Sequence, residues 1–135
     1  MKSFLELQNS FIKNIKDNYI LYLGKYNIKQ PEIITEFLDL DKYKNDFCMF
    51  VEFNKIEFPE SKYDDDCEKS IRQHISVYLV FRNDSVHNIR ENMQNATYAF
   101  YEMLCNTNIK INGIDYYHYV EGQKYIVASQ ISIIV

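Results

Sequence analysis

The chain contains little glycine, proline or cysteine and no tryptophan: its 135 residues include three Gly, two Pro and three Cys. Linkers between domains are commonly rich in glycine, serine or proline, so the sequence offers no segment where a second domain would separate. A hydrophobic content of 47% can supply a core without disulfides or a structural metal. We therefore expect a single domain that spans residues 1–135.

Motifs for catalysis, metal binding and nucleotide binding are also absent. There is no P-loop, no GxGxxG fingerprint and no GxSxG nucleophile elbow. The three histidines lack the short spacing that zinc sites use, and the odd number of cysteines argues against a disulfide framework and for a reducing compartment. We expect no enzymatic activity and no cofactor.

The charge balance and the hydrophobic runs narrow the possible partners. The net charge is -4 and only Arg72, Arg82 and Arg90 are arginines, so no basic cluster indicates sequence-specific nucleic-acid binding. No apolar run approaches the roughly 20 residues of a membrane span, and Glu6 interrupts the N-terminal segment where a signal peptide would be continuously apolar. Residues with AT-rich codons are abundant. We expect a protein of the bacterial cytoplasm, encoded by an AT-rich bacterial or phage genome.

Hydrophobic spacing in the first half of the chain predicts a helix, a short helix and two strands. Apolar residues at intervals of three and four predict a helix over residues 3–23 that ends at Gly24. Pro31 favours a short second helix over residues 32–40, although the same residues permit a short strand. Residues 46–53 and 70–81 are rich in aromatic and β-branched residues and predict strands.

The second half predicts a helix followed by a hairpin. Residues 84–105 have an apolar stripe at helical spacing, with Asp84 or Ser85 as the cap and the end at Asn106 or Asn108. Asn112-Gly113 is typical of a tight turn, and two alternating strands over 114–120 and 124–135 follow, joined at Glu121-Gly122. The fold class is α+β, with a mainly antiparallel sheet of about four strands and helices 3–23 and 84–105 packed on it.

Two groups of residues could form surfaces for partners. Residues 57–68 predict an acidic loop in which Asp64, Asp65, Asp66 and Glu68 could meet a partner or a cation, although a solvated loop is the simpler interpretation. Residues 116–119 form an aromatic strand in which alternation places Tyr117 and Tyr119 on one face and Tyr116 and His118 on the other. Because basic residues are absent nearby, sheet packing or a subunit interface is favoured over base stacking.

The order of elements resembles that of the tailed-phage tail-terminator or tail-completion proteins of the neck. The resemblance rests on residues 70–135: the strand SIRQHISVYLVF, the helix DSVHNIRENMQNATYAFYEMLC and the hairpin IDYYHYVEGQKYIVASQISIIV. It implies a non-enzymatic structural protein that forms a ring, commonly a hexamer, at the head–tail junction. Its partners would be other copies of itself, the tail-tube protein and the head-connector protein, and its final location the virion neck.

The C-terminal hairpin is the expected site of self-association, because a long apolar strand left at an open sheet edge invites pairing. An internal position within the monomer would cover that strand equally well. The candidate interface residues are Tyr117, Tyr119, Ile131, Ile133 and Val135. Two alternatives stay open: a small ligand-binding or enzymatic domain that uses His74, Tyr78, Tyr117 and His118, and an acidic adaptor or immunity-type protein.

Overall fold

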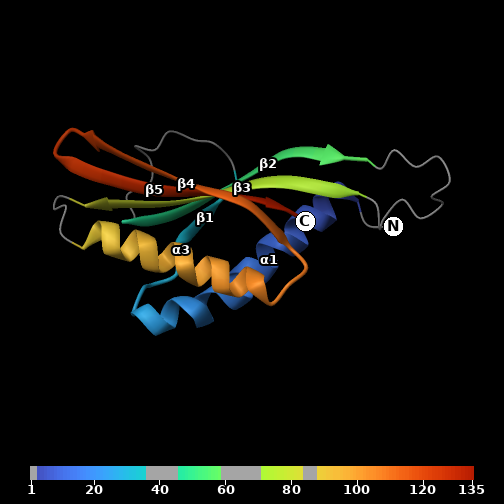
Figure 1. Cartoon of the computed structure of the whole chain (residues 1–135), viewed down its shortest axis with the longest axis horizontal. Helices are drawn as coiled ribbons and strands as arrows, with labels where there is room; N and C mark the ends of the chain where they lie inside the picture. The colour runs from blue at the N-terminus through green and yellow to red at the C-terminus, as the bar shows by residue number, and fades with distance from the viewer. Residues whose placement is uncertain (1–2, 36–45, 59–70, 84–87) are drawn as a thin grey trace.

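A sheet of five strands lies over two helices (Figure 1). The computed structural model describes residues 3–35, 46–58, 71–83 and 88–135. In chain order the elements are α1 (Phe4–Leu23), the 3-10 turn η1 (Gly24–Tyr26), β1 (Glu32–Ile34), β2 (Phe47–Glu57), β3 (Arg72–Asn83), α3 (Ile89–Cys105), β4 (Lys110–Glu121) and β5 (Lys124–Ile134).

The strand order across the sheet is β1-β2-β3-β5-β4. β1 runs parallel to β2, and the other neighbouring strands are antiparallel. The predicted α+β class with a mainly antiparallel sheet is therefore confirmed. The C-terminal strand β5 lies inside the sheet, and β4 forms one edge.

Helix α1 begins and ends where the sequence predicts, but the conformation at its end differs from the expected one. Ser3 and Glu6 form a capping box: the Glu6 amide donates to Ser3 Oγ at 3.2 Å, and the Ser3 amide donates to Glu6 Oε2 at 3.1 Å. Gly24 is not the left-handed stop that we expected, because its φ is -58° and the chain continues through η1. Asn27, with φ of 57°, adopts the left-handed conformation instead.

The short helix predicted after Pro31 is wrong for Glu32–Ile34, which form β1. This strand pairs with β2 so that Ile33 lies beside Met49 and Ile34 beside Phe50. Ile33 packs against the core between the helices and the sheet, while Ile34 is buried on the opposite face of the sheet. Pairing with a distant strand overrides the local helical preference. Residues 36–40 of the predicted helix lie outside the described residues.

β2 and β3 extend past their predicted ends. β2 continues to Glu57 with an irregularity between Phe53 and Lys55, so it takes in the first residue of the predicted acidic loop. β3 runs to Asn83. Asp64, Asp65, Asp66 and Glu68 lie outside the described residues, so the predicted acidic surface has no structural description.

Helix α3 buries the predicted stripe. Its inward residues are Ile89, Met93, Ala96, Phe100 and Leu104. The described helix begins after Asn88, which has φ of 72° and caps it without a side-chain hydrogen bond; Asp84 and Ser85 lie outside the described residues. The helix ends at Asn106, one of the two predicted positions.

The C-terminal hairpin has the predicted strands but not the predicted first turn. Asn112-Gly113 is an irregularity within β4, so the expected tight turn there is wrong: the chain continues along β5 with one extra residue. The turn between β4 and β5 is Gly122-Gln123. Gly122 has φ of 61° and Gln123 does not have positive φ, which matches a type II′ turn with glycine at its first central position.

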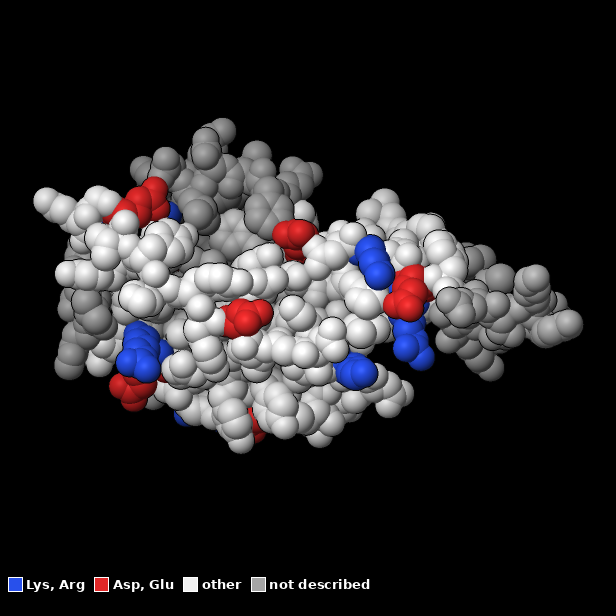
Figure 2. All heavy atoms as spheres, turned by 45° about the horizontal axis from the view of Figure 1, so that its top comes forward, with Lys and Arg blue, Asp and Glu red and all other residues white. Residues whose placement is uncertain are grey.

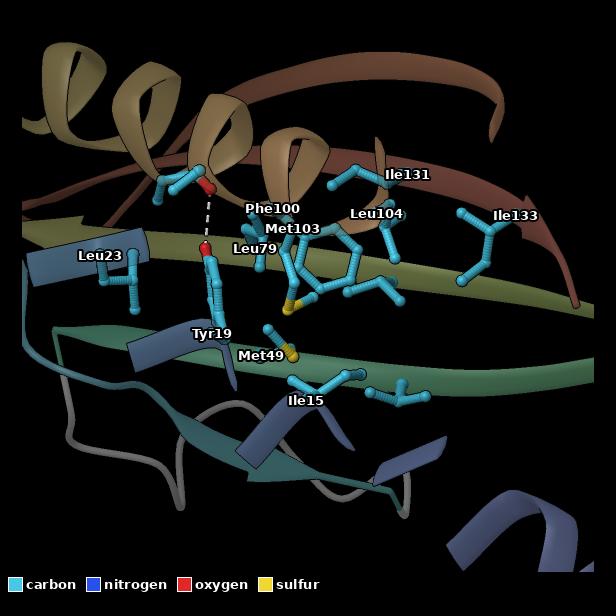
Figure 3. Close-up of a cluster of buried hydrophobic side chains, with 14 of the residues drawn as sticks. Ile15, Tyr19, Leu23, Met49, Leu79, Phe100, Met103, Leu104, Ile131 and Ile133 are labelled. Carbon is cyan, nitrogen blue, oxygen red and sulfur yellow. Dashed lines mark hydrogen bonds between the residues drawn. The ribbon is translucent and has the colours of Figure 1, made fainter. Parts of the chain in front are cut away.

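The main core lies between the helices and the sheet (Figure 3). Tyr19 is fully buried there, its ring packed edge-on against Phe100 at a centroid distance of 5.3 Å. Its hydroxyl donates to the Ala96 carbonyl at 2.7 Å, which joins α1 to α3. Burial raises the pKa of the Tyr19 phenol well above its ordinary value, so the group stays neutral and keeps donating.

Replacing Tyr19 with Phe should lower the free energy of unfolding by about 1 kcal/mol, because the buried hydrogen bond is lost while the ring keeps its packing. Urea denaturation followed by circular dichroism should show a lower midpoint with an unchanged slope. Tyr22→Phe is the matched control, because the Tyr22 hydroxyl only accepts an exposed hydrogen bond from Asn106 Nδ2 at 2.9 Å. Equal midpoints for the two variants would contradict the assigned role of Tyr19.

Candidate subunit interface

The edge strand β4 carries a row of exposed aromatic and apolar side chains. Tyr116 is 54% exposed, Tyr117 48%, Tyr119 44% and Val120 62%. Monomeric proteins seldom expose a continuous apolar surface of this kind, and edge strands that remain single are usually protected by lysine or proline. Between Ile111 and Val120, β4 contains neither of these residues.

The side chains of β4 alternate between the two faces of the sheet as predicted. Tyr117 and Tyr119 lie beside Ala128 and Ile126, on the face of the sheet away from the helices. Tyr116 and His118 lie beside Ser129 and Val127, on the face that the helices cover elsewhere. The edge therefore presents aromatic groups to both sides.

The backbone of β4 is free along its outer side. Gln73 and Val135 exchange both backbone hydrogen bonds, which fixes the alternation of the ladder between β3 and β5. Following that alternation through the pairing of β3 with β5 and of β5 with β4, Asp115, Tyr117 and Tyr119 bond to β5. The outward amides and carbonyls belong to four residues: Ile114, Tyr116, His118 and Val120. These groups can pair with another strand.

A chain of hydrogen bonds holds the Tyr117 side chain on the face of the sheet away from the helices. Its hydroxyl donates to Gln130 Oε1 at 2.9 Å, and Gln130 Nε2 lies 3.5 Å from Ser76 Oγ. The same Ser76 oxygen accepts from Asn54 Nδ2 at 2.7 Å. The chain crosses from β4 to β2, so the polar side chains orient one another over the width of the sheet. Figure 2, which turns the sheet side towards the viewer, shows acidic and basic side chains scattered over the described surface, with no large patch of one sign.

Two tyrosines of this face, Tyr119 and Tyr78, have pKa values raised above the ordinary value. Burial and then the nearby Glu121 carboxylate raise the pKa of Tyr119. Burial and then the Glu52 carboxylate raise the pKa of Tyr78. Neutral phenols can both bury their rings and donate a hydrogen bond to a partner.

The other candidate interface residues differ from Tyr117 and Tyr119. Ile131 and Ile133 are almost completely buried in the core beneath the helices, which leaves no surface of theirs for a subunit contact. Val135 is 43% exposed. Sequence reasoning also missed the exposed aromatics of α3, Tyr98 and Tyr101, although both fall outside the apolar stripe of that helix.

The four residues of the ligand-binding alternative do not converge. Tyr78 and Tyr117 lie on the face of the sheet away from the helices, but His118 lies on the helix face. His74 is paired with Glu57, with 2.8 Å between Nε2 and Oε2. Two hollows of about 350–370 Å³ are lined by other residues, one near Phe47 and Arg82 and one between α1 and the end of α3.

The described part of the chain shows no metal site and no helix that could span a membrane. Within residues 3–35, 46–58, 71–83 and 88–135, no group of three or more His, Cys, Asp or Glu side chains is placed to hold a metal ion. Over the same ranges, no helix is long and apolar enough to cross a membrane. Cys48 is buried and Cys105 is exposed, and among the described residues neither forms a disulfide.

The pair of His74 and Glu57 yields a prediction about pH. The hydrogen bond from His74 is the largest cause that lowers the Glu57 pKa. In the folded protein the Glu57 carboxylate therefore stays ionised at pH values somewhat below the ordinary carboxyl pKa. The resulting stabilisation is present above the ordinary carboxyl pKa and is lost as pH falls through the lowered one. In NMR titrations, His74→Phe should move the Glu57 midpoint upward, while Arg90→Gln, on α3, should leave it in place. An unchanged midpoint in His74→Phe would contradict the assignment.

No family model matches the chain, and no curated protein matches it. The order of its elements and the geometry of the β4 edge are therefore the observations from which its function has to be argued.

Proposed function

We propose that this protein is a structural subunit that assembles into a ring at the head–tail junction of a tailed phage or prophage, as a tail-terminator or tail-completion protein. The observation that carries the proposal is β4, an edge strand of 12 residues with exposed aromatic side chains, whose outer side pairs with no strand among the described residues. The ring is built from copies of this chain, and its faces meet the tail-tube and head-connector proteins.

An edge of this length is a surface for strand pairing. Each outward amide and carbonyl of β4 is satisfied by water in the monomer and by a neighbouring backbone in the assembly. The tyrosines add large, rigid surfaces on both sides of the edge at a small entropic cost. A role of β4 in contacts between subunits accounts for these features together. Backbone pairing would provide affinity, and the aromatic side chains would provide a surface that matches the neighbouring subunit.

The element order supports the phage assignment. Strand β3, helix α3 and the hairpin of β4 and β5 follow one another as in the neck proteins that the sequence resembles, and α1 and β2 are compatible with the same layout. Proteins of that family join as rings and perform no chemistry. Under this proposal the chain is made in the bacterial cytoplasm and ends in the neck of the particle.

The purified protein should self-associate, and two lysines on the outer side of β4 should prevent it. In Tyr116→Lys/His118→Lys, charge is placed at residues whose backbone faces outward, so the ladder to β5 stays intact. Light scattering over a concentration series should show rings for the wild type, visible by negative-stain electron microscopy, and monomers for the double variant.

Leu21→Lys is the matched control, because Leu21 is 70% exposed on α1 and lies away from β4. This variant should assemble like the wild type. A wild-type protein that stays monomeric at high concentration would refute the proposal, as would a double variant that assembles normally while folded.

A further inference from the structure

In the part of the chain that the structure describes, the sheet has a second edge with an unpaired stretch, on the side opposite β4. β1 pairs only with Cys48–Phe50 of β2. Among the described residues, no strand lies beside the outer side of β2 from Val51 to Glu57. The side chains of Asn54, Lys55 and Glu57 are exposed there, so this stretch is open to a partner.

In this stretch, as in β4, the residues whose backbone groups point outward have their side chains on the helix face. Continuing the alternation fixed by Gln73 and Val135, Glu52 bonds to Ser76 of β3, and Val51, Phe53 and Ile56 point outward. The side chains of these three residues lie on the helix face. Tyr116 and His118, the outward residues of β4, also lie on the helix face.

We infer that the β4 edge of one copy pairs antiparallel with the Val51–Glu57 edge of the next copy. The inference rests on the proposed function, because it names the partner surface through which the subunits of the ring join. The contact is heterologous: it uses two different surfaces of each chain, as a cyclic assembly of more than two subunits requires.

Strand directions and side-chain faces both agree with this pairing. Each of the three steps from β2 through β3 and β5 to β4 is antiparallel, so β4 and β2 run in opposite directions. A neighbour in a similar orientation therefore presents β2 antiparallel to β4. In an antiparallel ladder, directly opposed residues share one face, and here the outward residues of both edges lie on the helix face.

Charge selects the register. With Tyr116 opposite Phe53, Asp115 comes next to Asn54 and Lys55, so opposite charges meet. Sliding the strands by two residues in one direction places Asp115 opposite Glu52, and sliding them in the other direction brings it to Glu57. Both of these shifts oppose like charges. Pairing stops near His118, because β1 of the neighbour occupies the next part of the edge.

The same arrangement completes the layer of helices. α1 packs over β2, with the rings of Phe11 and Phe53 at a centroid distance of 6.3 Å, so the neighbour's α1 accompanies its β2. That helix arrives on the face where Tyr116 is exposed, beside an α3 whose Tyr98 and Tyr101 are 54% and 43% exposed. Pairing of β4 with the β4 of another copy would instead close a dimer and leave the β2 edge open in both subunits.

Reversal of the two charges tests the inference on the full-length chain. Asp115→Lys and Lys55→Asp should each raise the concentration for half-maximal assembly about five- to tenfold, because each opposes like charges across the junction. The double variant Asp115→Lys/Lys55→Asp should return to near the wild-type value. Lys29→Asp is the control for an equal change of charge and should have no effect, because Lys29 is exposed and precedes β1, at the end of β2 opposite Val51–Glu57.

A photo-activatable benzoylphenylalanine at Tyr116 gives a second, direct measurement. Cross-linked peptides identified by mass spectrometry should join β4 of one copy to residues 51–57 of another. Rings whose cross-links join β4 to β4, or in which Lys55→Asp has no effect, would overturn this inference and leave the ring proposal standing. A wild-type protein without any assembly would overturn the ring proposal itself.

Discussion

The position of β5 inside the sheet is the constraint on which the other features depend. The last strand of the chain inserts between β3 and β4 and pairs with both over nearly its whole length. Its residues after Lys124 carry no charged side chain, which suits a strand with neighbours on both sides. Once β5 is internal, the strand before it has only one neighbour. β4 therefore becomes the edge, and its tyrosines remain at the surface.

The helices are held over the sheet by buried polar contacts as well as by apolar packing. Thr97 Oγ1 lies 2.7 Å from Ser129 Oγ, and the pair is buried between α3 and β5. The Tyr19 hydroxyl ties α1 to α3. Because unpaired polar groups in a core are costly, these contacts specify where each helix lies. On the helix face of β4, Ile111 and Ile114 pack against this core, whereas Tyr116 and His118 stay exposed.

Regular patterns in the sequence predicted most of the fold, and features that depend on distant partners did not follow from it. The stripe of α3 and the alternation from Tyr116 to Tyr119 are local, and both predictions are confirmed. β1 is three residues long and exists because β2 lies beside it, which no periodicity reveals. Asn112-Gly113 has the composition of a turn, but the register with β5 makes it an irregularity within a strand.

The candidate interface was predictable in the same limited way. Alternation separates Tyr117 from Tyr116, yet whether a hairpin strand is internal or at an edge depends on strand order, which a single sequence does not contain. Ile131 and Ile133 were grouped with the tyrosines for that reason, although they lie on β5 and fill the core. The free part of β2 depends on the short length of β1, again a property of the assembled sheet.

Two unlike edges, one complete and one half covered, distinguish an interface with a direction from one that pairs with itself. Neighbouring strands in a sheet rotate by about 20–25° relative to each other, so strand pairing between copies turns each subunit with respect to the last. Contacts between the neighbouring helices then decide whether that rotation closes a ring or continues as a filament.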